Sequence, residues 1–158
     1  ADAHGFRYRA GMLRLIIFPY KVQFKTLRTH IMLKEPLSRQ FETAKRQLLD
    51  TLRACRVFVS NYKWGDAAGF KMALYSGDEV GTIGDTIAWQ PECRMEINLP
   101  GRGEIRLICD GREVNRETGR TLSLPIAQPG VYRLEVYRRG RGWIFSNHVR
   151  VRPHATGG

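Results

Sequence analysis

The segment EIRLICDGREV, residues 104–114, carries the strongest structural signal in the sequence. Apolar residues dominate before position 110, and Asp110-Gly111 then separates two strand-like runs. An Asp-Gly pair between such runs is the strongest short-range hairpin signal, because both residues tolerate the positive φ that a two-residue turn requires. The stretch therefore predicts two antiparallel strands joined at Asp110 and Gly111.

Alternating apolar and polar residues extend this pattern to residues 93–100, 131–139 and 143–152. Side chains at every second position of a strand share one face. Those expected to face inward are Cys93, Met95, Ile97, Leu99, Tyr132, Leu134, Val136, Trp143, Phe145, Val149 and Val151. About seven short strands in roughly ninety residues are typical of an immunoglobulin-like antiparallel β-sandwich, which we place at residues 65–153.

Tyr132 adds a more specific signal to this region. It enters a predicted strand just after Pro129-Gly130. A tyrosine in that position favours a tyrosine corner, in which the hydroxyl bonds to backbone a few residues upstream. The spacing of Cys and Trp residues found in antibody domains is absent from the sequence, so we expect a sandwich of a different kind.

Before about residue 65 the pattern is helical rather than alternating. Residues 38–56 carry apolar side chains at steps of three and four, and Ser38 is the expected N-cap. The apolar stripe consists of Phe41, Ala44, Leu48, Leu52 and Cys55. With strand-like runs at 14–18 and 56–60, the order strand, helix, strand predicts a small α/β piece that cannot close a sheet alone.

Charge and cysteine content narrow the functional classes. The chain has 26 basic and 15 acidic residues, a formal charge of +11, which attracts polyanions such as nucleic acid. Arginines stand beside aromatic residues in YRRGRGW at 137–143, as they do in single-strand binders, but no known nucleic-acid-binding signature is present. The three cysteines lack zinc or disulfide spacing and favour a reducing, cytoplasmic setting. The apolar runs are too short to predict a membrane span.

Asp2 and His4 form a possible metal-ligand pair in the opening residues, Ala-Asp-Ala-His-Gly. In a strand, residues two positions apart project to the same side. A carboxylate with an imidazole suits zinc, manganese or iron. By its spacing alone the motif is a weak signal, and a polar tail at the terminus is the favoured interpretation. His30 lies in an apolar context, where we expect a structural role.

The order of these segments resembles the C-terminal portion of a PHP (polymerase and histidinol phosphatase) family metallohydrolase, in the carbaryl-hydrolase-type branch. The resemblance covers residues 1–152 and is most specific at Asp2-Ala3-His4, Arg28-Thr29-His30, Leu52-Arg53 with Arg56 and Phe58, and Trp143 to Asn147. Cys55 departs from it, standing where the family usually has Gly, and His148 stands where Pro is usual.

The resemblance implies that Asp2 and His4 supply two ligands to a cluster of divalent metal ions, zinc, manganese or iron. The remaining ligands would lie upstream of Ala1, in an N-terminal barrel segment of the same protein. It also implies hydrolysis of a small phosphoester by the complete protein. Two ligands cannot hold such a cluster, so we expect the chain alone to be inactive. No catalytic or cofactor-binding residue is assigned.

The expected architecture is thus an α+β fragment. Residues 1–64 would be the closing segment of a PHP-type α/β barrel, residues 65–153 the immunoglobulin-like sandwich, and residues 154–158 a disordered tail. Two alternatives stay open. The first alternative is a non-enzymatic basic β-domain that binds nucleic acid or another polyanion. The second is a structural module whose sheet edges mediate assembly.

Overall fold

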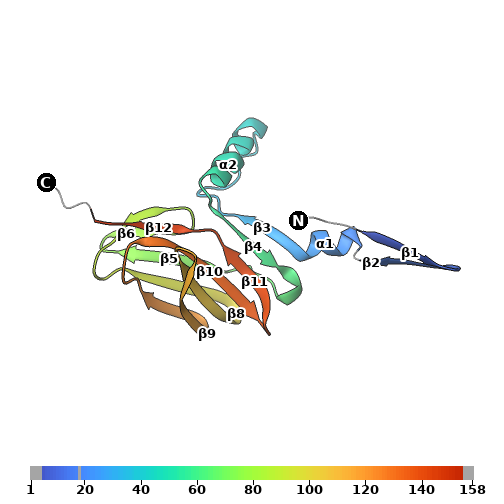
Figure 1. Cartoon of the computed structure of the whole chain (residues 1–158). Coiled ribbons are helices and arrows are strands. Elements are labelled where there is room, and N and C mark those ends of the chain that lie inside the picture. The colour runs from blue at the N-terminus through green and yellow to red at the C-terminus, as the bar shows by residue number, and fades with distance from the viewer. Residues whose placement is uncertain (1–4, 18, 155–158) are drawn as a thin grey trace.

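The computed structural model describes residues 5–17 and 19–154, and most of the chain forms antiparallel β-structure (Figure 1). We call residues 5–64 the N-terminal segment and residues 65–152 the C-terminal region. The N-terminal segment contains β1 (Phe6–Ala10), β2 (Leu13–Ile17), α1 (Tyr20–Thr26), β3 (Leu27–Ile31), α2 (Phe41–Arg53), β4 (Val57–Asn61) and the 3₁₀-helix η1 (Tyr62–Trp64). The C-terminal region contains β5 (Lys71–Ser76), β6 (Glu79–Gly81), β7 (Thr86–Ala88), β8 (Arg94–Cys109), β9 (Arg112–Pro125), β10 (Gly130–Arg138), β11 (Arg141–Ser146) and β12 (Val149–Arg152).

Strands β3 to β12 belong to one curled sheet, whose main path is β3-β4-β11-β10-β8-β5-β6. The long strand β8 connects its two parts, because its first half pairs with β5 and its second half with β10. Strand β9 runs beside both halves of β8, and its register shifts between Asn98 and Gly103. A shift of this kind lets a long strand bend, so β8 can pair in both parts of the curled sheet. The only parallel pair among the described strands is β7 with β12.

The predicted hairpin at residues 110–111 is confirmed. Asp110 and Gly111 have φ values of 47° and 82°, and Cys109 pairs with Arg112 across the turn. Two consecutive residues with positive φ match the twist of antiparallel strands, which explains why Asp-Gly is favoured there.

The predicted inward faces are confirmed over most of the C-terminal region, and all but one of the eleven side chains are buried. The exception is Phe145, which is half-buried, while its neighbour Ile144 is fully buried. The prediction was wrong there because β10 pairs Val136 with Ile144 but Tyr137 with Gly142, so Trp143 is an extra residue in a β-bulge. A bulge directs two successive side chains to one face and breaks the alternation.

The tyrosine corner is also confirmed. The Tyr132 hydroxyl donates to the Gln128 carbonyl oxygen over 2.7 Å, and the ring is buried beneath the start of β10. Burial, with the nearby Cys109 thiol, raises the pKa of Tyr132, so this hydroxyl stays protonated as a donor.

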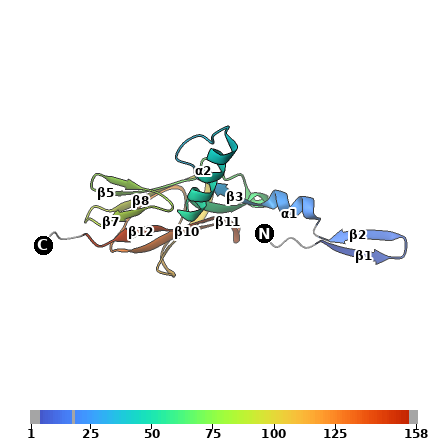
Figure 2. The same cartoon turned by 90° about the horizontal axis from the view of Figure 1, so that it is seen from above.

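In the N-terminal segment, the predicted strand, helix and strand all form, but the prediction that they make one α/β unit was wrong. Strand β2 pairs with β1 in a separate hairpin that extends away from the curled sheet (Figure 2). Strand β4 instead pairs with β3 and with β11, both in antiparallel fashion. The described strands of this segment form no barrel, since β3 and β4 continue the sheet of the C-terminal region.

Helix α2 forms where the apolar periodicity predicts it, but its ends differ from the prediction. The helix begins at Phe41 after Gln40, and the Ser38 hydroxyl accepts from the Gln40 backbone N–H instead of capping the first turn. At the other end, Cys55 has φ 57° and lies beyond the helix. No helix among the described residues is long and apolar enough to cross a membrane.

Candidate functional site

The predicted metal ligands Asp2 and His4 lie outside the described residues. Gly5 is the first described residue, and a Cβ there would lie only 3.2 Å from Cε2 of Tyr20. Helix α1 therefore packs closely on the chain directly after the Asp-Ala-His motif. Glycine at position 5 makes this close approach possible, because it has no side chain.

Within residues 5–17 and 19–154, no group of three or more His, Cys, Asp or Glu side chains could hold a metal ion. A stable catalytic site requires several protein ligands per ion and fixed support behind them. The described part of the chain therefore does not by itself provide a ligand set for the metals that the resemblance implies.

The clearest anomaly is the exposed apolar surface of the N-terminal segment. Of the sixteen exposed large hydrophobic side chains in the described residues, fourteen lie between Phe6 and Val59. Helix α2 has no buried residue, and Phe41 at its start is 73% exposed. Folded proteins rarely leave an apolar surface of this extent uncovered, and such surfaces mark interaction sites.

His30 on β3 contacts a serine in a geometry that superficially suggests catalysis. Its Nε2 atom lies 2.8 Å from Oγ of Ser60, and its ring stacks on Phe58 with centroids 4.2 Å apart. Ser60 is fully buried, so its hydroxyl cannot reach a substrate. Burial and the neighbouring Arg28 lower the pKa of His30, which keeps the ring neutral. The contacts agree with the structural role expected for His30.

A second polar group surrounds η1. Arg28 lies over the Tyr62 ring, 3.7 Å from its centroid, and the Tyr62 hydroxyl bonds to Asp66. The hydrogen bond from the Ala68 backbone N–H is the main cause that lowers the pKa of Asp66, and the hydrogen bond from the Tyr62 hydroxyl lowers it further. Asp66 in turn raises the pKa of Tyr62. This group keeps its acid ionised and its phenol protonated, and so it contains no activated nucleophile.

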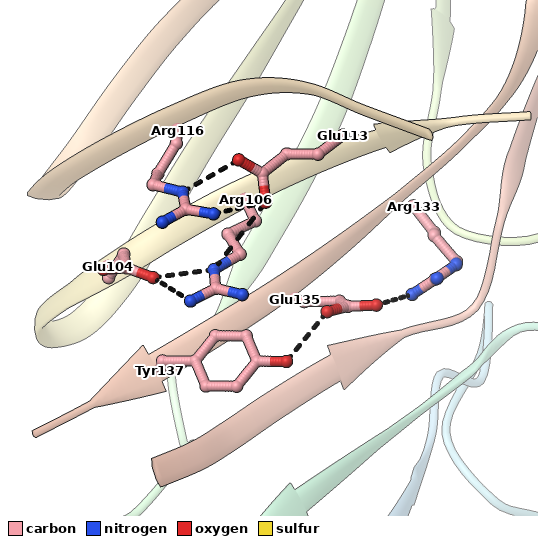
Figure 3. A network of polar contacts seen from close by, with 7 residues as sticks. All are labelled: Glu104, Arg106, Glu113, Arg116, Arg133, Glu135 and Tyr137. Carbon is pink, nitrogen blue, oxygen red and sulfur yellow. Dashed lines mark hydrogen bonds and ion pairs between the residues drawn. The ribbon is translucent and has the colours of Figure 1, made fainter. Parts of the chain in front are cut away.

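On the outer face of β8, β9 and β10, arginine and glutamate residues neutralise one another (Figure 3). Arg116 donates to both carboxylate oxygens of Glu113 over 2.8 and 2.9 Å, and Arg106 lies 2.6 Å from Glu104. Glu135 pairs with Arg133 and accepts from the Tyr137 hydroxyl over 2.9 Å. These pairings account for part of the arginine-rich pattern as internal ion pairs on a solvated sheet face.

A cleft of about 740 Å³ lies beside this network. One wall is formed by Lys63 and Trp64 of η1, and the other by the middle of β8 and the end of β10. Its remaining lining residues are Arg102, Gly103, Glu104, Thr118, Tyr137, Arg138, Arg139 and Gly140. Four of the lining side chains are basic and one is acidic, so the cleft favours an anion electrostatically.

Sequence reasoning identified part of this cleft and missed the rest. The segment YRRGRGW indicated that Arg138 and Arg139 stand beside the aromatic residue Tyr137. Lys63 and Trp64 were missed because they lie more than seventy residues earlier and no local motif links them to β10.

The two buried cysteines are unsuitable as nucleophiles. Cys93 and Cys109 are buried, and burial raises the pKa of both thiols. A buried, protonated thiol is a poor nucleophile and a poor metal ligand. Both thiols instead pack as small hydrophobic side chains in the core.

The chain matches no family model, and no curated protein or solved structure matches it either.

Proposed function

We propose that this chain is the C-terminal portion of a metal-dependent hydrolase of the PHP type that cleaves a small phosphoester. Asp2 and His4 contribute ligands to its divalent metal cluster, which contains zinc, manganese or iron. The N-terminal segment completes a barrel supplied by an upstream portion of the same protein. The C-terminal region is an accessory β-sandwich of the immunoglobulin-like kind, and the chain alone is inactive.

The observation that carries this proposal is the uncovered apolar surface of the N-terminal segment. An amphipathic helix in a folded protein buries its apolar face. The apolar face of α2 includes Leu52, which is 43% exposed, and the hairpin β1–β2 exposes Phe6 and Tyr8. These elements have the composition of a domain interior without the neighbours that would bury them. A barrel that packs on them supplies those neighbours.

The end of α2 offers further support. The Cys55 N–H donates to the Leu52 carbonyl over 3.0 Å, and the Arg56 N–H donates to the Thr51 carbonyl over 3.1 Å. These two bonds, with positive φ at Cys55, define a Schellman motif, whose left-handed position glycine occupies most often. The resembling family usually has Gly at this position. The positive φ at Cys55 gives a physical reason for that preference.

Bound divalent ions would lower the pKa of a coordinated water and stabilise charge on the phosphoester. The described residues have a positioning role. Helix α1 closes on Gly5 through Tyr20 and so constrains the chain that leaves the motif. Beyond α1, β3 joins this region to the curled sheet through β4.

The test is to produce the chain joined to its native upstream sequence and to measure metal content and hydrolysis of bis(p-nitrophenyl) phosphate. We expect bound metal and turnover in the longer protein, and neither in the 158-residue chain. Asp2→Ala with His4→Ala should abolish both, whereas His154→Ala, at an exposed position, should not. Turnover by the isolated chain that survives Asp2→Ala with His4→Ala would refute the proposal, as would a longer protein that binds no metal.

A further inference from the structure

The basic cleft joins residues from three distant parts of the chain. Lys63 and Trp64 belong to η1, Arg102 lies in β8, and Arg139 occupies the turn between β10 and β11. Its volume of about 740 Å³ falls in the range of ligand-binding clefts.

The positive charge of the cleft is not neutralised. Lys63, Arg102 and Arg139 form no ion pair with any described residue. The single carboxylate in the lining, Glu104, already pairs with Arg106 at 2.6 Å. Cations in a concave surface focus their field and raise the local concentration of anions.

Arg138, at the back of the cleft, is held in place by its surroundings. It donates to the carbonyl oxygens of Trp64 and Arg102, each over 3.0 Å, and lies 3.7 Å from the Trp143 ring centroid. A Cβ at Gly65 or at Gly101 would collide with its guanidinium group. The two glycines therefore leave room for one fixed arginine that joins η1 to β8 and β10 and shapes the cleft.

The neighbouring face of the same sheet provides an internal comparison. There, Arg106, Arg116 and Arg133 each pair with a glutamate (Figure 3). The cleft cations Lys63, Arg102 and Arg139 have no such partner. Exposed arginines outside the cleft, such as Arg112 and Arg150, also have no ion pair among the described residues, so the distinguishing feature of the cleft is that its unpaired cations line one concave surface beside Trp64.

We propose that this cleft binds single-stranded nucleic acid. Lys63, Arg102 and Arg139 contact successive phosphates, and the half-buried Trp64 offers its ring for base stacking. A concave cleft with an aromatic wall suits a flexible single strand, whereas duplex recognition uses an element that projects into a groove. The proposal is independent of the hydrolase proposal, since it involves neither Asp2 nor His4.

The test measures binding of a fluorescein-labelled single-stranded DNA oligonucleotide by anisotropy at several salt concentrations. The cleft variant is Lys63→Gln with Arg102→Gln and Arg139→Asn. Asn suits position 139, where φ is 50° in a two-residue turn, so the variant should fold. The matched control is Arg112→Gln with Arg150→Gln and Arg152→Gln, which removes the same charge from exposed positions outside the cleft.

We expect the cleft variant to lose at least about tenfold in affinity and to lower the slope of log K against log salt by about 2, as expected for three lost phosphate contacts. The control should change affinity by less than about threefold. Equal losses in both variants would show that only net charge matters and would refute the site. Absence of binding by the unmodified chain would refute it as well. Stronger competition by duplex DNA or by heparin than by unlabelled single strand would refute the ligand class.

Discussion

The N-terminal segment and the C-terminal region use similar apolar residues with opposite results. In the C-terminal region, Leu134, Val136 and Trp143 are fully buried within the curled sheet. In the N-terminal segment, Phe24, Phe41 and Leu52 are exposed although α1 and α2 are well formed. The apolar pattern of a helix or strand thus specifies which of its faces should be covered. That face becomes buried only where another element of the fold packs against it. The C-terminal strands supply those neighbours to one another.

The largest expected effect tests this contrast directly. Leu134→Ala, in the core of the sheet, should lower the free energy of unfolding by about 3 kcal/mol, because it leaves a cavity. Leu52→Ala on α2 should cost less than about 1 kcal/mol in the 158-residue chain. Chemical denaturation monitored by tryptophan fluorescence measures both.

The same pair of substitutions in the longer protein sharpens the comparison. If a barrel covers α2, Leu52→Ala should there become as costly as a core substitution, about 2 kcal/mol or more. An unchanged, small cost in the longer protein would mean that α2 remains uncovered.

A smaller effect is expected at the tyrosine corner. Tyr132→Phe removes the bond to the Gln128 carbonyl and should cost about 1 kcal/mol, the usual net value of one hydrogen bond. Tyr8→Phe, in the exposed β1, is the matched control and should have no measurable effect. Equal unfolding midpoints for the two variants would show that the corner does not stabilise the C-terminal region.

Cys55→Gly should stabilise the protein by up to about 1 kcal/mol, because glycine adopts the positive φ at this position without the steric cost of a Cβ. Cys93→Gly is a contrasting control. Cys93 is buried in the core, so this substitution should destabilise the protein instead. Thermal unfolding of the two variants gives the sign of each effect. Destabilisation by Cys55→Gly would mean that the thiol has a role beyond ending α2.

The smallest effect is a dependence on pH in the C-terminal region. Burial raises the pKa of Glu135, but its bonds to Arg133 and Tyr137 lower it by more, so the net shift is downward. A carboxylate with a lowered folded-state pKa stabilises the protein above its unfolded pKa, about 4.5, and this contribution disappears as pH falls further.

Glu135→Gln should therefore flatten the loss of stability between about pH 5 and pH 3. Glu117→Gln, at an exposed position on β9, should leave the profile unchanged. The measurement is the denaturation midpoint at each pH. Parallel profiles for the unmodified protein and Glu135→Gln would show that the network in Figure 3 contributes no acid sensitivity.

Much of the C-terminal region was predictable because its signals are local. The turn at Asp110-Gly111 depends on two residues that tolerate positive φ, and the tyrosine corner depends on a few residues around Tyr132. The bulge at Trp143 was not predictable, since an extra residue in a strand becomes visible only when its partner strand is known. Asp2 and His4 remain predictions, because they lie outside the described residues.

Local sequence specifies the turn at residues 110–111, the alternating core strands and the existence of an amphipathic helix near residues 41–53, because periodicity and turn chemistry act over a few neighbouring residues. The pairing of β4 with β11, the uncovered position of α2, and the shared cleft of Lys63, Arg102 and Arg139 arise only in the folded chain. Those features depend on pairing between distant segments, and local preferences do not specify which segments pair.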